Sequence, residues 1–179
     1  MMVPRSMSVP MVALSALLLS ACAAMPGGAP AAAAKLEPTR GNTTSGTALF
    51  KQAGEGIVLT VRVEGLKPGA EHGFHIHEKG DCSSGDGMST GGHFNPAGKP
   101  HGKHDDAERH AGDLPSLKAD ANGRAEATFT LGGLGIGGGA ADIVGRGLIV
   151  HAQPDDYKTQ PTGNAGARLA CGVIQRHPA

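Results

Sequence analysis

The strict alternation of apolar and polar residues in short segments constrains the fold of this chain most. In residues 57–63, Ile-Val-Leu-Thr-Val-Arg-Val, the side chains of Leu59, Val61 and Val63 fall on one face. A period of two residues is typical of a β-strand with one buried face. No stretch of ten or more residues shows the 3.6-residue apolar period of an amphipathic helix. The pattern predicts an all-β sandwich or barrel.

Similar short segments recur along the chain between turn signals. Residues 66–69 (Leu-Lys-Pro-Gly) and 120–123 (Asp-Ala-Asn-Gly) have the composition of tight turns. The segments expected to form strands are 47–51, 57–64, 72–78, 116–119, 125–131, 147–152 and 169–175.

The N-terminus has the composition of an export signal. Arg5 precedes an apolar run, residues 9–19, that is shorter than the roughly 20 residues needed to span a bilayer. The run ends in Leu19-Ser20-Ala21-Cys22, which resembles the bacterial lipobox, where cleavage leaves a lipid-modified cysteine. An ordinary cleaved signal that discards Cys22 is the alternative.

This organisation divides the chain into three parts. Residues 1–21 are expected to be the signal peptide, and residues 22–34 the lipidated cysteine with a flexible tether of Ala, Pro and Gly. Residues 35–179 are expected to form one domain with a single core. Aromatic residues are scarce, so that core must be largely aliphatic.

Charge and cysteine content bound the partners and the compartment. The formal net charge is zero and no long basic run exists, so nucleic acid is a poor partner candidate and membrane association is expected only through the lipid. If Cys22 carries lipid, Cys82 and Cys171 remain as a pair in an oxidising compartment, where a disulfide is expected. Two buried free thiols are the alternative.

Histidines are concentrated around two long segments without apolar periodicity. Residues 79–115 contain His93, His101, His104, His110 and Asp113, and residues 154–167 form the second segment. Loops of such length are usually functional or disordered. So many nitrogen donors indicate a metal centre, with a hydrophilic surface loop as the alternative.

The string His75-Ile76-His77 adds two further imidazoles within an alternating segment. On a strand both would point to one face while Phe74 and Ile76 point to the other. Two imidazoles on a rigid strand form half of a site suited to copper or zinc. A solvated strand face with two polar residues is the alternative.

Four strings carry most of these residues in a distinctive order. They are residues 73–78 (Gly-Phe-His-Ile-His-Glu), 92–96 (Gly-His-Phe-Asn-Pro), 108–113 (Glu-Arg-His-Ala-Gly-Asp) and 163–174 (Gly-Asn-Ala-Gly-Ala-Arg-Leu-Ala-Cys-Gly-Val-Ile). Together they resemble the copper/zinc superoxide dismutase family over roughly residues 35 to 176. Residues 82–84 and 154–157 are similar to its exported bacterial branch. The resemblance implies an eight-stranded Greek-key β-barrel or sandwich.

The resemblance also implies an enzyme that converts two superoxide anions and two protons to dioxygen and hydrogen peroxide. Copper bridged to a structural zinc would be alternately reduced and reoxidised, with one ion of each metal per subunit. Copper would be held by His75, His77, His93 and His151, and zinc by His93, His101, His110 and Asp113.

Further roles follow from the same resemblance. Arg168 would attract and orient superoxide, His93 would supply a proton, and Asp155 would hydrogen-bond metal-ligating histidines. His104 is expected to be exposed and His72 to be a buried hydrogen-bonding residue, while His177 lies in the tail.

The expected location is the periplasmic side of a bacterial envelope, with a lipid anchor at Cys22. The outer membrane is favoured, because Ala23 follows the cysteine in place of the aspartate that is associated with retention in the inner membrane. The subunit is expected as a monomer or a homodimer. A copper or zinc carrier with the same fold, and a structural sandwich with incidental histidines, are the alternative functions.

Overall fold

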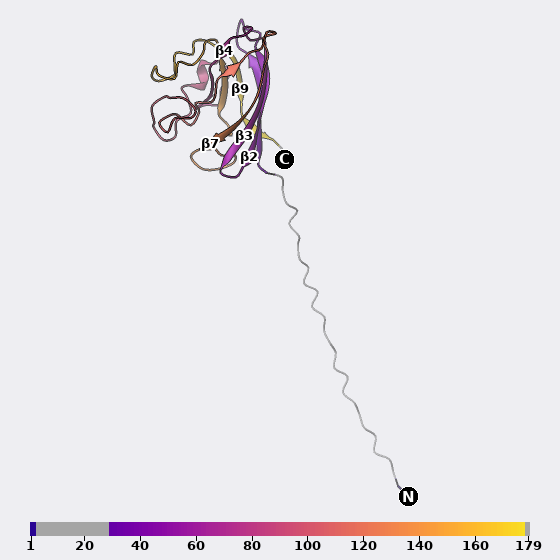
Figure 1. Ribbon diagram of the computed structural model, residues 1–179. Helices are drawn as coiled ribbons and strands as arrows, with labels where there is room; N and C mark the ends of the chain where they lie inside the picture. The colour runs from indigo at the N-terminus through magenta and orange to yellow at the C-terminus, as the bar shows by residue number, and fades with distance from the viewer. Residues whose placement is uncertain (3–28, 178–179) are drawn as a thin grey trace.

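Ten strands form in the part of the chain that this computed structural model describes, residues 1–2 and 29–177. Eight of them make one antiparallel sheet that curls around a core, in the order β5-β8-β9-β1-β2-β3-β7, with β10 also paired to β1 (Figure 1). The bounds are β1 Ala31–Pro38, β2 Ser45–Ala53, β3 Gly56–Glu64, β4 Glu71–His72, β5 Phe74–His77, β6 Leu117–Lys118, β7 Ala125–Gly132, β8 Gly147–His151, β9 Arg168–Val173 and β10 Gln175–His177. β4 pairs with β6, and Met88–Thr90 forms a short 3₁₀ helix, η1. The all-β class is confirmed.

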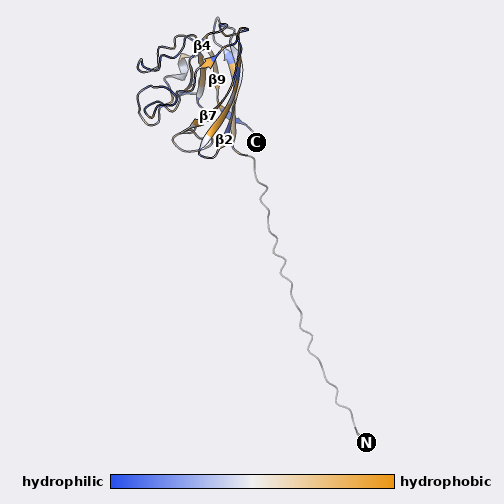
Figure 2. Ribbon diagram, viewed as in Figure 1, coloured by the Kyte–Doolittle hydropathy of each residue, from blue (hydrophilic) through white to orange (hydrophobic). Residues whose placement is uncertain are grey.

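Burial along β3 follows the alternation of its sequence. Ile57, Leu59 and Val61 are fully buried, whereas Arg62 on the opposite face is exposed. Across the antiparallel partners, β2 and β7, the buried residues meet in one core that is aliphatic except for a few phenylalanines such as Phe50. Figure 2 shows the hydrophobic residues along the strands and more hydrophilic residues in the long loops.

The predicted tether is wrong at its C-terminal end. Residues 31–34 form the first half of β1, which pairs with both β2 and β10. Ala32 and Ala34 are buried beside the core, where a small side chain fits under the curled sheet. A run of alanines has no alternation of polarity, so its sequence could not reveal a strand. Cys22, the predicted lipidation site, lies among residues 3–28, outside the described part.

Two long connections lie together on one side of the sheet (Figure 1). Residues 78–116 join β5 to β6, and residues 152–167 join β8 to β9. The first connection returns along β5, with bridges from His75 to Asp113 and from His77 to His93. None of the described helical segments has the length and apolarity needed to cross a membrane.

Candidate metal centre

Strand β5 presents His75 and His77 on one face and buries Phe74 and Ile76 in the core on the other. All four side chains belong to residues with 0% exposure, because the long loops cover the histidine face. The alternative of a solvated strand face is therefore wrong. Covering the histidines removes water from them, and their polar nitrogens then need partners from the protein or from a bound ion.

His75 and His77 meet His93 and His151 in one buried cluster. One ring nitrogen from each of the four lies within 4.8 Å of those of the others. His93 comes from the first long loop, while His151 ends β8 at a register shift between Val150 and His151. A bulge of this kind re-aims a side chain.

Hydrogen bonds orient the rings of this cluster. The Nδ1–H groups of His77 and His151 donate to the carbonyls of Gly91 (2.9 Å) and Gly166 (3.2 Å). His75 donates from Nε2–H to Asp155 Oδ2 at 2.7 Å. Each bond places the proton of a neutral ring on one nitrogen and leaves the other nitrogen unprotonated, with a free lone pair. That second nitrogen is the one that faces the cluster.

A second buried cluster contains His93, His101, His110 and Asp113. Oxygen Oδ1 of Asp113 lies 2.8 Å from His93 Nδ1, 3.0 Å from His101 Nδ1 and 3.3 Å from His110 Nδ1. Bonds of about 2.0 Å in a tetrahedral zinc site separate its ligand atoms by about 3.3 Å. The other oxygen of Asp113 accepts the backbone N–H groups of His110 and Gly102. These two bonds fix the carboxylate so that Oδ1 faces the histidine nitrogens of the cluster.

Unpartnered nitrogens show that both clusters fit metal ions. Among the described residues, the buried side-chain nitrogen or oxygen atoms without a hydrogen-bond partner are all histidine nitrogens. Six of the seven lie in the two clusters: His75 Nδ1, His77 Nε2, His93 Nε2, His101 Nδ1, His110 Nδ1 and His151 Nε2. Such atoms are rare in proteins unless an ion or a water satisfies them. Three imidazoles and one carboxylate make a closed set typical of structural zinc, while four imidazoles suit copper.

Asp155 connects the two clusters from the second long loop. Its Oδ2 accepts from His75, and its Oδ1 accepts from His101 Nε2 at 2.9 Å. This carboxylate hydrogen-bonds one histidine of each cluster. One buried side chain therefore orients a histidine of each cluster.

Burial and neighbouring groups shift the pKa values of the cluster. Burial lowers the pKa of His93 to about 4, despite the opposing hydrogen bond to Asp113. Burial also disfavours the charged form of His101, but the neighbouring carboxylates of Asp113 and Asp155 outweigh it and raise its pKa to about 9. Although burial acts in the opposite direction, the imidazoles of His101, His110 and His93 around the carboxylate hold the pKa of Asp113 far below its usual range. His93 is thus neutral at pH 7, and its unprotonated ring nitrogen can offer an electron pair to an ion.

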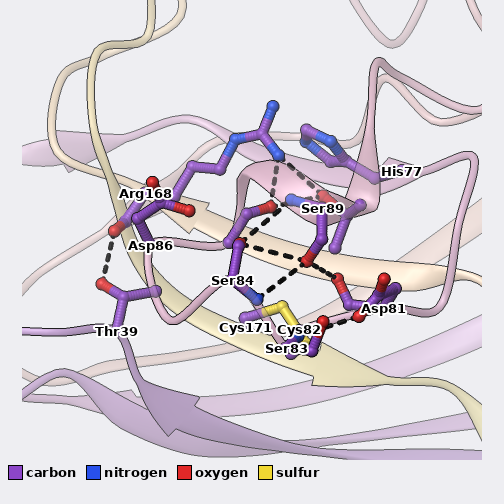
Figure 3. Close-up of a disulfide and its surroundings, with 12 residues drawn as sticks. Thr39, His77, Asp81, Cys82, Ser83, Ser84, Asp86, Ser89, Arg168 and Cys171 are labelled. Atoms are coloured by element: carbon purple, nitrogen blue, oxygen red, sulfur yellow. Dashed lines mark hydrogen bonds between the residues drawn. A yellow bond between two sulfur atoms is a disulfide. The ribbon is translucent and has the colours of Figure 1, made fainter.

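Arg168 begins β9 directly opposite His151 in the sheet register. Its guanidinium donates to the carbonyls of Gly87 (2.5 Å) and Gly91 (2.8 Å) and to Thr90 Oγ1 (2.7 Å). Figure 3 shows the guanidinium above the disulfide loop and close to the ring of His77. A fixed cation therefore borders the first cluster, where it can attract a small anion.

The predicted disulfide between Cys82 and Cys171 is confirmed. It joins the loop that holds Arg168 to strand β9, three residues after Arg168 itself. Ser89 Oγ donates to the carbonyl of Asp81 at 2.6 Å and braces the same loop (Figure 3).

The remaining histidines have mixed outcomes. His104 is half-buried, and its Nδ1 lies 3.0 Å from the carbonyl oxygen of Asp113, so the prediction that it is exposed is wrong. It lies outside both clusters. His72 is buried, as predicted, and its Nδ1–H donates to the carbonyl of His151 at 2.8 Å. His177 ends β10 and pairs with Ala31.

Several contributors to the site have no signal in the sequence. The carbonyls of Gly91 and Gly166 orient two histidines, yet every residue has a carbonyl. The Gln160 side chain accepts from the backbone N–H of His101 and donates to its carbonyl, at 2.8 and 2.9 Å. Such contacts between distant segments become visible only in the folded chain.

Comparison with known proteins agrees with this geometry. The family model described as copper/zinc superoxide dismutase matches residues 44–174. The crystal structure of the clock protein EA4 is 39% identical, covers 82% of this chain and 94% of its own, and has a TM-score of 0.75. A double mutant of a SOD-like protein from Bacillus subtilis is 38% identical, with coverages of 80% and 96% and a TM-score of 0.73. By the extent of the family match and the shared fold, this chain belongs to the copper/zinc superoxide dismutase family.

Proposed function

We propose that this protein is a superoxide dismutase that uses one copper and one zinc ion per subunit. Copper is assigned to the first cluster, His75, His77, His93 and His151, and zinc to the second, His93, His101, His110 and Asp113. The reaction consumes two superoxide anions and two protons and releases one dioxygen and one hydrogen peroxide. Bound copper would supply the one-electron redox chemistry that no side chain of this site can provide.

The observation that carries the proposal is the position of His93 in both clusters, beside an oriented arginine. Its Nδ1 faces Asp113, and its Nε2 is a buried nitrogen without a hydrogen-bond partner. Arg168 contributes positive charge next to His77 and lowers that residue's pKa, after burial and the neighbouring His93 and His151. A site for two ions and a small anion is thereby supported.

Two side chains would act on the substrate. Arg168 attracts superoxide and holds it through N–H donors. His93 would carry a proton on Nε2 when its Nδ1 is engaged by an ion and Nε2 is not, and it would pass this proton to the oxygen species that is being reduced. Asp155 and the Gly91 carbonyl keep the surrounding rings in place.

The test is a superoxide decay assay on the purified full-length protein loaded with both metals, with parallel metal analysis. We expect one copper and one zinc per chain and rapid decay of superoxide. His93→Ala should lose the activity, because it removes a ligand from both clusters. Full metal loading without activity in the wild type would sink the enzymatic proposal.

A copper or zinc carrier is the second candidate. One compared structure is described as a clock protein and the other as SOD-like, so membership of this fold does not by itself imply dismutase activity. A carrier must release its ion, whereas these clusters are buried and closed by two loops. Transfer of copper to a chelating partner within seconds, together with no superoxide decay, would favour the carrier.

We further propose export with a lipid anchor at Cys22, on the periplasmic side of the outer membrane. The apolar N-terminal run and the small residues before Cys22 support it, and the disulfide suits an oxidising compartment. Labelling with a fatty acid and membrane fractionation of the wild type and Cys22→Ala test it. A soluble, unlabelled wild type would remove the anchor.

A further inference from the structure

Thr90 is a fully buried polar residue in η1, beside Arg168. Its hydroxyl donates to the carbonyl of Gly87 at 2.9 Å and accepts Nη1–H of Arg168 at 2.7 Å. A hydroxyl has one hydrogen and two lone pairs, so the bond to Gly87 aims a lone pair at the guanidinium. The threonine therefore has a defined hydrogen-bonding direction.

The donors of Arg168 can be counted. Nη1 carries two hydrogens, and the Gly87 carbonyl and Thr90 Oγ1 accept them; the Gly91 carbonyl accepts one from Nη2. Within residues 29–177 no hydrogen bond engages the second hydrogen of Nη2 or the Nε–H. A guanidinium has five N–H donors in a planar fork. The two that remain lie on different nitrogens, an arrangement that can hold both atoms of a diatomic anion.

The threonine itself is held firmly. Its methyl group Cγ2 lies so close to β8 that a Cβ added at Gly147 would come within 2.8 Å of it. Its carbonyl also accepts the backbone N–H of Lys79 at 3.0 Å. A β-branched side chain has few allowed χ1 rotamers, and this packing restricts them further.

We propose that Thr90 is a positioning residue that selects which edge of the Arg168 guanidinium meets the anion. By occupying the second hydrogen of Nη1, its hydroxyl prevents the guanidinium from turning and leaves Nε–H and one Nη2–H for superoxide. This inference deepens the proposed function and rests on it. Thr90 does not itself touch the substrate.

The test compares Thr90→Val, which keeps the shape and loses the hydroxyl, with the wild type. Azide, a small linear anion, is titrated into the copper- and zinc-loaded full-length protein and followed by visible absorption. We expect azide affinity to fall roughly 3- to 10-fold, less than the direct loss of a hydrogen bond to a charged group would cause, because Thr90 does not touch the anion. The superoxide decay rate should fall by a similar factor. Metal content should not change.

Thr90→Ser and Thr90→Ala form a second pair, in which both lack the methyl and only serine keeps the hydroxyl. The serine variant should bind azide more tightly than the alanine variant by a similar factor. This pair tests the role of the hydroxyl even if the valine variant does not fold. In an Arg168→Met background, Thr90→Val should cause no further loss, because the arginine it orients is absent.

Equal azide affinity in the folded, metal-loaded members of both pairs would overturn the positioning role. If the wild type does not consume superoxide but azide affinity depends on the hydroxyl as expected, the dismutase proposal fails and the role of Thr90 stands. The two failures are therefore distinguishable.

Discussion

Single residues in this protein gain their roles from the hydrogen bonds of their neighbours. His77 lies on β5 and His151 ends β8, yet both donate Nδ1–H to a backbone carbonyl and leave Nε2 without a hydrogen-bond partner in the same cluster. A ring nitrogen that is fixed in this way binds an ion without first having to reorient. Arg168 belongs to neither cluster, so its mutation should affect the binding of the anion without affecting the binding of the ions.

Arg168→Ala should lower the rate of superoxide decay about tenfold or more, since a hydrogen bond to a charged group contributes about 1.5–3 kcal/mol. Copper and zinc content should remain, because Arg168 belongs to neither cluster. The dependence of the rate on ionic strength should also weaken. Lys158→Ala, which removes an exposed cation from the second loop, is the matched control. The steering role would be refuted if wild type and Arg168→Ala responded equally to salt.

Zinc binding should release about one proton from His101 at pH 7.5. In the metal-free protein the pKa of His101 is raised to about 9, so its Nδ1 holds a proton that zinc must displace. Zinc affinity should therefore rise roughly tenfold per pH unit near neutrality and level off above about pH 9. Calorimetry in buffers of different ionisation enthalpy measures the proton. His104→Ala, outside the cluster, should release the same number, and no release from the wild type would contradict the prediction.

At the scale of elements, the loop between β8 and β9 holds the site together. Asp155 near its start contacts both clusters, and the carbonyl of Gly166 near its end orients His151. Hydrogen bonds join this loop to the first long loop, and one of them links Ser116 Oγ to Tyr157 Oη at 2.8 Å. Closing two long loops costs conformational entropy, and these polar contacts offset part of it.

Gln160→Ala should weaken zinc binding roughly 5- to 150-fold, because two hydrogen bonds of about 0.5–1.5 kcal/mol each are lost between the loop and the backbone of His101. Competition with a chelator measures the affinity. The control is Thr162→Ala in the same loop, for which the structure shows no bond to His101. Equal zinc affinity for Gln160→Ala and wild type would show that Asp155 alone holds the loop to His101.

The whole molecule depends on a link between distant parts of the chain. The disulfide joins Cys82 and Cys171, which are 89 positions apart, and it attaches the first loop to the curled sheet. The strands carry one continuous core and three of the six clustered histidines, while the first long loop carries the other three. The rigid sheet thereby serves as the support for irregular segments that could not hold their shape alone.

The double variant Cys82→Ser/Cys171→Ser should lose about 4 to 5 kcal/mol of unfolding free energy, the chain-entropy value for closing so long a loop. Urea denaturation of the metal-free protein gives the number without a contribution from ions. Reduced wild type should match the double variant within error. An unchanged urea midpoint would mean that the bond does not constrain the unfolded chain.

The sequence predicted much of this architecture correctly where the signal is local. The alternation in β3 and the pair His75 and His77 come from a backbone period of two residues, which any short window displays. The segment Ala31–Ala34 lacked that signal and was predicted wrongly. Spacing alone could not distinguish His101 from His104 as a candidate zinc ligand. The resemblance of four strings to a known family favoured His101.

By itself, therefore, the sequence determined the all-β class, the pair of histidines on one strand face and the presence of a histidine-rich loop. The tertiary structure alone decided which nitrogen of each ring is bare, how Asp155 joins the clusters, and that Thr90 and Gly91 hold Arg168. The physical reason is range: alternation is a property of neighbouring residues. Each of those contacts instead joins segments far apart in the chain, brought together only when the sheet curls and both loops close over it.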